Sequence, residues 1–391
     1  MINNQFSPWP SFTSEEADAV HKVLMSNKVN YWTGNECRDF EKEFALWTNS
    51  KYAIALGNGT QALEGALKAL DVSMGDEVIV TSRTYISSVS SIVNVGAIPK
   101  FADLDLNTQN IAPKSVRSMI TKKTKAIICV HLAGWPCEMD EIMSLANEFN
   151  LYVIEDCAQA HGAKYKGKSV GSIGNIGCWS FCQDKIMTTG GEGGMVTTND
   201  KSLWSKIWSY KDHGKSYEAV YEREHPKGFR WLNESFGTNW RMTEMQAVIG
   251  RIQLKRMSNW HTNRINNASK IWETAKQCNG LRVPDIPEHI EHGVYKCYVF
   301  VESSKLKNGW DRSRIMKEIN ASGVPCNVGA CPEVYLEKSF DKTGFRPKER
   351  LVNAKELGET SLMFLVHPTL TKDEIKKTCD SITYVMKLAN K

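Results

Sequence analysis

Short apolar runs that alternate with helical stretches over the first two thirds of the chain constrain its fold more than any other feature. Four runs have the length and composition of buried strands: residues 52–56, 77–80, 125–130 and 151–154. Helical periodicity lies between them, as at residues 139–149. Strands that alternate with helices form a mainly parallel sheet with helices on both faces. The sequence therefore predicts an α/β fold.

Length and helix signals predict two domains. A chain of 391 residues is longer than one ordinary hydrophobic core organises. Capping-box patterns, in which a Thr is followed three residues later by Glu or Gln, mark helix starts at Thr13, Thr243 and Thr371. The helix after Thr243 is predicted to lead out of the first domain. We expect a large cofactor-binding α/β domain over residues 1–255 and a smaller α+β domain over residues 256–391.

Composition and charge exclude several classes of protein. Hydrophobic residues make up 41% of the chain and charged residues 24%, the balance of a soluble globular protein. No apolar run approaches the roughly 18–20 residues of a membrane span, and the start lacks a basic region followed by an apolar block. We therefore expect a cytoplasmic protein without a membrane partner. The net charge of +5 suits anionic small molecules such as nucleotides, and no basic stripe or recognition helix predicts binding to nucleic acid.

The cysteines predict neither a metal site nor a redox centre. There are eleven, they are scattered, and no CxxC pair occurs. Cys178 and Cys182 are four residues apart, but no second pair or HxxxH completes a zinc site. We expect reduced thiols that pack as small core residues, and no bound metal.

Candidate chemistry lies in three segments that follow predicted strands, because ligands of an open parallel sheet bind beyond the carboxyl ends of its strands. The first, residues 57–60 (Gly-Asn-Gly-Thr), joins a strand to a helix whose free N–H groups and dipole favour a phosphate. The same pattern fits an ordinary turn. No Walker A sequence follows, and no GxGxxG opens a helix, so neither nucleotide hydrolysis nor a nicotinamide cofactor is expected.

The other two segments contain an aspartate and a lysine. Asp156 ends an apolar strand, where it fits either a cap of the next turn or a partner for a protonated heterocyclic nitrogen. Lys185 lies between a strand and a loop with four glycines. Most lone lysines are solvated, but here Ser180 and nearby Thr and Gly residues supply phosphate donors. A strand-end aspartate followed by serine, lysine and glycines predicts a pyridoxal 5′-phosphate (PLP) site.

Five segments in this order carry a family resemblance: NGTQAL, TSRTYISS, EDCAQAHGA, GCWSFCQDKIMTTGGEGGM and GTNWRMTEMQA. They resemble the hallmarks of the DegT/StrS family of nucleotide-sugar aminotransferases. The resemblance runs from about residue 8 to VHPTLTKDE at residues 366–374. It implies the fold-type I aminotransferase architecture and PLP as the cofactor.

The resemblance also implies roles for the residues that bind the cofactor ring. Lys185 matches the Schiff-base lysine, which also moves a proton between the donor's α-carbon and the cofactor. Asp156 matches the residue that keeps the pyridine nitrogen protonated. Gln159 matches the group against the 3′-oxygen of the ring, and Tyr85 matches an aromatic residue on the ring face.

The phosphate of the cofactor is expected on the N–H groups of Gly59 and Thr60 and the hydroxyl of Ser180. Asn239 matches a residue that reaches the cofactor phosphate of the neighbouring subunit, which implies a homodimer with shared active sites. A structural role is expected for five further residues, Arg241 as an ion-pair former, Thr243 as a helix cap, and His161, His213 and His367 without catalytic function.

The implied reaction takes the amino group of L-glutamate, releases 2-oxoglutarate, and aminates a nucleotide-linked 4-keto-6-deoxyhexose. A UDP-linked 2-acetamido sugar is the favoured acceptor, and the product is expected to feed lipopolysaccharide, O-antigen or another glycan. A 3-keto sugar, a GDP- or dTDP-linked sugar, a PLP-dependent sugar 3-dehydratase and a non-enzymatic regulator stay open as alternatives. The retained Lys185 argues against the dehydratase, because that branch carries a residue that cannot hold the cofactor covalently.

Overall fold

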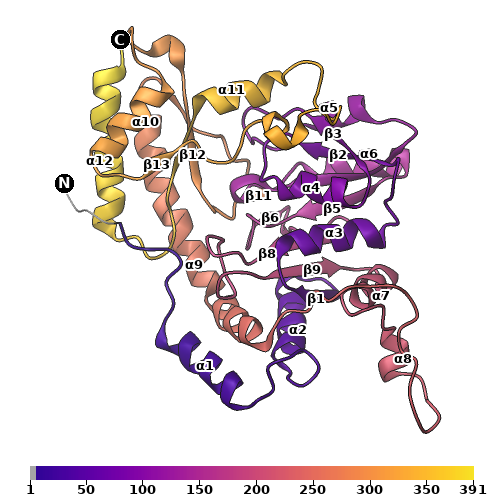
Figure 1. The fold of residues 1–391 in the computed structure, drawn as a ribbon. Helices are drawn as coiled ribbons and strands as arrows, with labels where there is room; N and C mark the ends of the chain where they lie inside the picture. The colour runs from indigo at the N-terminus through magenta and orange to yellow at the C-terminus, as the bar shows by residue number, and fades with distance from the viewer. Residues whose placement is uncertain (1–5) are drawn as a thin grey trace.

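The computed structural model describes residues 6–391 (Figure 1). Residues 1–5, part of the N-terminal stretch in which no targeting signal is expected, lie outside the described residues. The α-helices are α1 Ser14–Met25, α2 Glu36–Thr48, α3 Gly59–Ala69, α4 Ser87–Asn94, α5 Pro113–Met119, α6 Met139–Phe149, α7 Lys201–Tyr210, α8 Tyr217–Tyr221, α9 Glu244–Lys276, α10 Arg312–Ala321, α11 Val352–Thr360 and α12 Lys372–Ala389. The strands are β1 Tyr52–Leu56, β2 Glu77–Thr81, β3 Ile98–Ala102, β4 Thr124–Val130, β5 Tyr152–Asp156, β6 Lys164–Tyr165, β7 Lys168–Ser169, β8 Ile176–Ser180, β9 Gly194–Thr198, β10 Leu281–Arg282, β11 Ile290–Glu291, β12 Cys297–Val301, β13 Cys326–Asn327 and β14 Ser361–Phe364.

A seven-stranded sheet forms the centre of the larger part of the molecule. Its strand order is β1-β9-β8-β5-β4-β2-β3. The five strands β8, β5, β4, β2 and β3 run parallel to one another, whereas β9 runs antiparallel to both β8 and β1. Helices lie on both sides of this sheet (Figure 1). The predicted α/β fold with a mainly parallel sheet between helices is confirmed.

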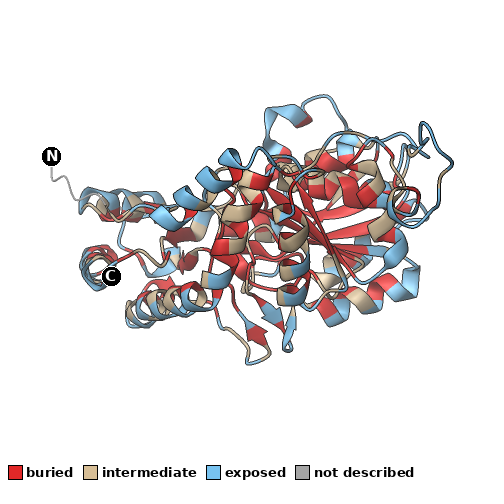
Figure 2. Cartoon of the chain, turned by 90° about the horizontal axis from the view of Figure 1, so that it is seen from below, coloured by how far each residue is buried: buried red, intermediate tan, exposed pale blue. Residues whose placement is uncertain are grey.

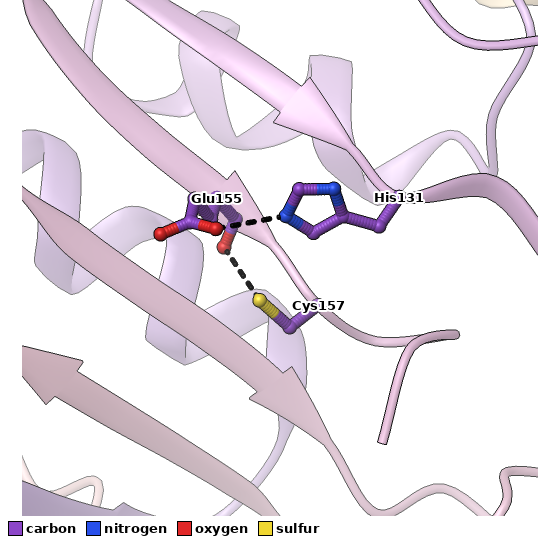
Figure 3. Close-up of side chains that lie close together, drawn as sticks. All are labelled: His131, Glu155 and Cys157. Carbon is purple, nitrogen blue, oxygen red and sulfur yellow. Dashed lines mark hydrogen bonds and ion pairs between the residues drawn. The ribbon is translucent and has the colours of Figure 1, made fainter. Parts of the chain in front are cut away.

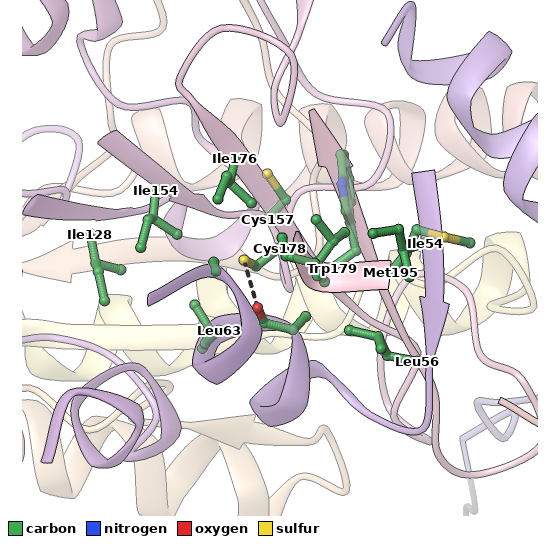
Figure 4. Close-up of a cluster of buried hydrophobic side chains, with 14 of the residues drawn as sticks. Ile54, Leu56, Leu63, Ile128, Ile154, Cys157, Ile176, Cys178, Trp179 and Met195 are labelled. Carbon is green, nitrogen blue, oxygen red and sulfur yellow. Dashed lines mark hydrogen bonds between the residues drawn. The ribbon is translucent and has the colours of Figure 1, made fainter. Parts of the chain in front are cut away.

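Alternate residues of the central strands enter two cores, one on each face of the sheet. Ile128 and Ile154 pack into the core that also contains Leu63 of α3 (Figure 4). Their chain neighbours Ile127 and Val153 pack into the core on the other face. Figure 2 shows the sheet strands largely buried and the outer faces of the helices exposed. Because both faces are covered, each strand appears in the sequence as a continuous apolar run.

The C-terminal part builds a second core around a four-stranded antiparallel sheet of order β10-β12-β14-β13. Helices α10 and α12 pack beside it, and α9 reaches it from the main sheet (Figure 1). The predicted domain boundary after residue 255 falls inside α9, which is one unbroken helix. The division at that residue stays a prediction.

The sequence signals located long elements accurately and missed short ones. All three capping boxes are present, at Thr13, Thr243 and Thr371. A small sheet of order β11-β6-β7 was not expected. Its strands have two residues each, too few for any periodicity to be visible in the sequence. Within residues 6–391, no helix has the length and apolar character needed to cross a membrane.

Candidate active site

The turn between β1 and α3 forms one wall of the candidate site. The Asn58 side chain accepts a hydrogen bond from the Gln61 N–H at 2.9 Å and caps α3. The N–H groups of Gly59 and Thr60 have no acceptor within the described part of the chain. A Cβ atom at Gly59 would lie 2.7 Å from the Cβ atom of Ser180, so only glycine permits this approach. Free N–H groups at a helix N-terminus beside a serine hydroxyl form an anion site.

Asp156 is the last residue of β5, which β9 and β8 separate from β1 in the sheet. Its side chain is buried and accepts hydrogen bonds from the Ser88 hydroxyl at 2.7 Å and the Ala158 N–H at 3.2 Å. Burial raises the pKa of Asp156, and neither these hydrogen bonds nor the charge of Lys185 fully offsets that effect. A buried carboxylate without a cation at hydrogen-bond distance fits a ligand that brings its own positive charge.

Lys185 lies in the loop after β8 and is fixed through its backbone. Its N–H donates to the carbonyl of Cys182 at 3.0 Å, and its carbonyl accepts from the indole of Trp9 at 2.8 Å. The Nζ atom lies 3.8 Å from a carboxylate oxygen of Asp184 and 5.3 Å from the ring centre of Tyr295. The Lys185 side chain is only 16% exposed, so its amine is held at the site and not in bulk solvent.

One cavity of about 680 Å³ brings most of the predicted residues together. Seven of the eight line it: Gly59, Thr60, Tyr85, Asp156, Gln159, Ser180 and Lys185. The side-chain oxygen Oε1 of Gln159 accepts from the Ala133 N–H at 2.9 Å, which leaves the side-chain NH₂ group of Gln159 as a donor. The Tyr85 side chain is 70% exposed, so its ring face is free to stack on a ligand.

Asn239 is the exception among the predicted residues. It is exposed and forms a backbone bridge with Asp212, outside the lining of this cavity. Arg241, two residues on, donates to Asp212 at 2.6 Å, and Thr243 caps α9, so both expected structural roles are confirmed. His161 packs against aromatic rings, and burial lowers its pKa to about 3.

A buried network behind the site was not found from the sequence. The Glu155 carboxylate lies 3.0 Å from His131 Nε2 (Figure 3). It also accepts from the N–H groups of Gly171, Ile173 and Gly174. Burial alone would raise the pKa of Glu155, yet the hydrogen bonds of His131 and these amides hold it below its ordinary value. The network joins β4, β5 and the loop before β8, and thereby fixes the adjacent Asp156.

The hydrogen bonds of this network argue against a metal site. Glu155, His131 and Cys157 lie close enough to hold an ion (Figure 3). Both oxygens of Glu155 already accept two hydrogen bonds each, and His131 Nδ1 accepts from the Cys137 N–H at 3.0 Å. Because the ligand lone pairs are engaged in holding the fold together, we interpret the cluster as structural.

Comparison with known proteins agrees with this geometry. Residues 10–383 match the model of the DegT/DnrJ/EryC1/StrS aminotransferase family. The chain belongs to this family. Its enzymes are PLP-dependent sugar aminotransferases, so PLP is the cofactor of this aminotransferase. The lining residues fit that molecule, because they offer a lysine amine, a buried carboxylate without a cation and free N–H groups at a helix start.

Individual relatives cover nearly the whole chain. The solved aminotransferase from Psychrobacter cryohalolentis is 65% identical, with a TM-score of 0.96 over 98% of this chain and 99% of that chain. A GDP-perosamine synthase of Escherichia coli O157:H7 is 36% identical over 95% of this chain and 96% of its own length. A UDP-N-acetyl-3-dehydro-alpha-D-glucosamine 3-aminotransferase of Acidithiobacillus ferrooxidans is 32% identical over 92% and 90%, respectively.

Proposed function

We propose that this aminotransferase moves the amino group of L-glutamate to a nucleotide-linked 4-keto-6-deoxyhexose, with a UDP-linked 2-acetamido sugar as the first candidate. The observation that carries the proposal is the convergence of Lys185, Asp156 and the phosphate-binding turn on one cavity. A lysine amine, a buried carboxylate and an anion site together suit amino transfer through PLP, and suit neither phosphoryl transfer nor hydride transfer. The amino sugar would serve the synthesis of lipopolysaccharide, O-antigen or another glycan.

The two central residues have distinct tasks in this proposal. Bound PLP supplies an electron-withdrawing ring, which stabilises negative charge on the carbon that loses its proton. Asp156 accepts the N–H of the pyridine ring and keeps that nitrogen positive, since the buried carboxylate otherwise lacks a counter-charge. Lys185 holds the cofactor covalently at rest and carries the proton between the α-carbon of glutamate and the cofactor carbon that receives the amino group.

The other lining residues fix the position of the ring. The N–H groups of Gly59 and Thr60 and the Ser180 hydroxyl bind the phosphate at the start of α3. The NH₂ group of Gln159 donates to the 3′-oxygen of the ring, and Tyr85 stacks on the ring face. Together these contacts orient the reacting carbon toward Lys185.

A second, adjoining cavity has room for the nucleotide sugar. Its volume is about 780 Å³, and it shares Thr84, Tyr85 and Lys185 with the first. Tyr298 and Lys338 also line it. The names of the two sugar-specific relatives support a nucleotide-linked acceptor, one with GDP and the other with a UDP-linked N-acetyl sugar.

A homodimer completes the proposed site. Asn239 is exposed and follows residues 222–238, a segment in which the side chains of Phe229, Trp231 and Phe236 are at least three-quarters exposed. Large exposed aromatic side chains that lie together mark a surface that a partner covers. We propose that this segment packs on a second copy of the chain, and that Asn239 there binds the cofactor phosphate of the neighbouring active site.

The experiment that tests the function is a panel of ketosugars. UDP-, GDP- and dTDP-linked 4-keto and 3-keto sugars are each incubated with the PLP-loaded enzyme and L-glutamate, and the products are analysed by mass spectrometry and NMR. We expect amination at C4 of the UDP-linked 2-acetamido sugar, with stoichiometric 2-oxoglutarate. Amination of a GDP- or dTDP-linked sugar, or at C3, would correct the acceptor, and loss of water without amination would contradict amino transfer.

A further inference from the structure

A third cavity lies beside the active site, where the N-terminal segment meets α9 and the strand β12. Its volume is about 330 Å³, and Trp9, Arg264 and Lys296 line it. It shares Asp184, Tyr295 and Lys296 with the large cavity that contains Lys185. None of the residues expected from the sequence to bind PLP lines this space, so it is a separate subsite next to the reacting lysine.

Arg264 lines this cavity with hydrogen-bond donors that lack acceptors. Its side chain is 1% exposed, with the guanidinium centre 5.0 Å from the Trp9 ring and Nη1 3.4 Å from the carbonyl of Tyr295. Nε and Nη2 have no acceptor among residues 6–391. Burial lowers the pKa of Arg264 to about 9, so the group is still charged at neutral pH. A buried guanidinium with two nitrogens unpaired is costly unless an anion accepts from their N–H groups.

The groups that face the cavity leave a net positive charge. Lys296 is largely buried, and no ion pair or hydrogen-bond acceptor for its amine is found in the part of the chain that the structure describes. Asp184 is the one carboxylate in the lining, and it is shared with Lys185 and with the hydroxyl of Tyr295. His367 adds no negative charge, since burial lowers its pKa to about 3 and leaves it neutral.

We propose that Arg264 and Lys296 bind the side-chain carboxylate of the dicarboxylate amino donor, the carboxylate remote from the amino group that is transferred. This inference rests on the proposed function, because it assigns a site to the donor of that reaction. The guanidinium fork suits two oxygens of one carboxylate, and Pro8 and Val366 offer apolar contacts for the methylene groups. The cavity is less than half the volume of its neighbour, which favours a five-carbon diacid here and the nucleotide sugar there.

The test measures binding of glutarate, a five-carbon diacid without an amino group, to the PLP-loaded enzyme by calorimetry. We expect Arg264→Met and Lys296→Met each to weaken glutarate binding about tenfold or more, and Arg264→Lys to recover part of the loss. Lys270→Met is the matched control, because it removes one positive charge from the exposed face of the same helix. Glutarate should bind the control and the wild type equally well.

Two further binding measurements distinguish a dicarboxylate site from a site for any carboxylate and from a nucleotide site. Butyrate, with one carboxylate, should bind at least about tenfold more weakly than glutarate, and UDP should bind Arg264→Met as well as it binds the wild type. Unchanged glutarate affinity in both Met variants, or lost UDP affinity with glutarate unaffected, would overturn the inference. Thermal melting checks that Arg264→Met folds, and Lys296→Met supplies the answer if it does not. Since glutarate binding needs no sugar acceptor, a failed ketosugar panel leaves this result interpretable.

Discussion

Substituting Gly59 by alanine tests the proposed phosphate-binding turn most directly. The new Cβ atom would lie 2.7 Å from Ser180 Cβ and 3.1 Å from Ser180 Oγ. Ordinary contact begins near 3.4 Å, so the start of α3 and the end of β8 must separate by about 0.7 Å. Such overpacking costs about 1–3 kcal/mol of stability. The movement also disrupts one charge-assisted hydrogen bond to the phosphate, worth about 1.5–3 kcal/mol, so the Kd for PLP should rise about tenfold to a hundredfold.

The control for this prediction lies on the same helix. At Gly65 an added Cβ atom would meet Ile207 Cγ2 at 3.6 Å, an ordinary contact. Gly65→Ala should therefore raise the stability of α3 by up to about 1 kcal/mol and leave PLP affinity unchanged. The assay is a PLP titration of each apo-protein by absorbance, repeated with pyridoxal, which lacks the phosphate. If Gly59→Ala bound PLP like the wild type, or lost pyridoxal affinity equally, the assignment of the turn to the phosphate would be wrong.

Three other predictions follow from the site. Lys185→Ala should lower the rate of amino transfer by about 10²–10⁴-fold or more. Lys168→Ala, a control at an exposed position, should leave that rate unchanged, and a steady-state assay with glutamate measures both. Glu155→Gln should destabilise the fold by about 1–3 kcal/mol in urea unfolding at pH 7, while the exposed Glu148→Gln should change little. The pKa of Glu155 is held below its ordinary 4.5 in the fold, so the ionised carboxylate stabilises the fold above that value and this stabilisation is lost as pH falls through the lowered folded-state pKa. The difference in unfolding free energy between the wild type and Glu155→Gln should therefore shrink in acid. Mixing inactive Lys185→Ala and Asn239→Ala chains should restore part of the activity in hybrid dimers, and no recovery, or a fully active monomer, would contradict a shared site.

The sequence predicted the elements that carry strong local signals. The strand at residues 52–56 and the helix at residues 139–149 have the bounds that their apolar patterns indicate. Seven of the eight predicted site residues meet in one cavity because each follows a strand of the same sheet edge or lies in the turn beside it. Local pattern and fold topology were sufficient for these features.

Contacts between residues far apart in the chain could not be predicted from the sequence in the same way. Nothing in the sequence pairs His131 with Glu155, or Ser88 with Asp156, because these partners are 24 and 68 residues apart and meet only after the strands align. Arg264 resembles any other cation on a polar helix until the N-terminal segment covers it. Asn239 is exposed, so the role proposed for it could be tested only with a second copy of the chain.

The central claim is that the amine of Lys185 holds the cofactor covalently. The most direct measurement is borohydride reduction of the PLP-loaded enzyme, followed by proteolysis and mass spectrometry of the peptides. The account predicts a phosphopyridoxyl group on Lys185 in the wild type, and none in Lys185→Ala. Attachment to another lysine, or PLP that stays unattached after reduction of an active enzyme, would contradict it.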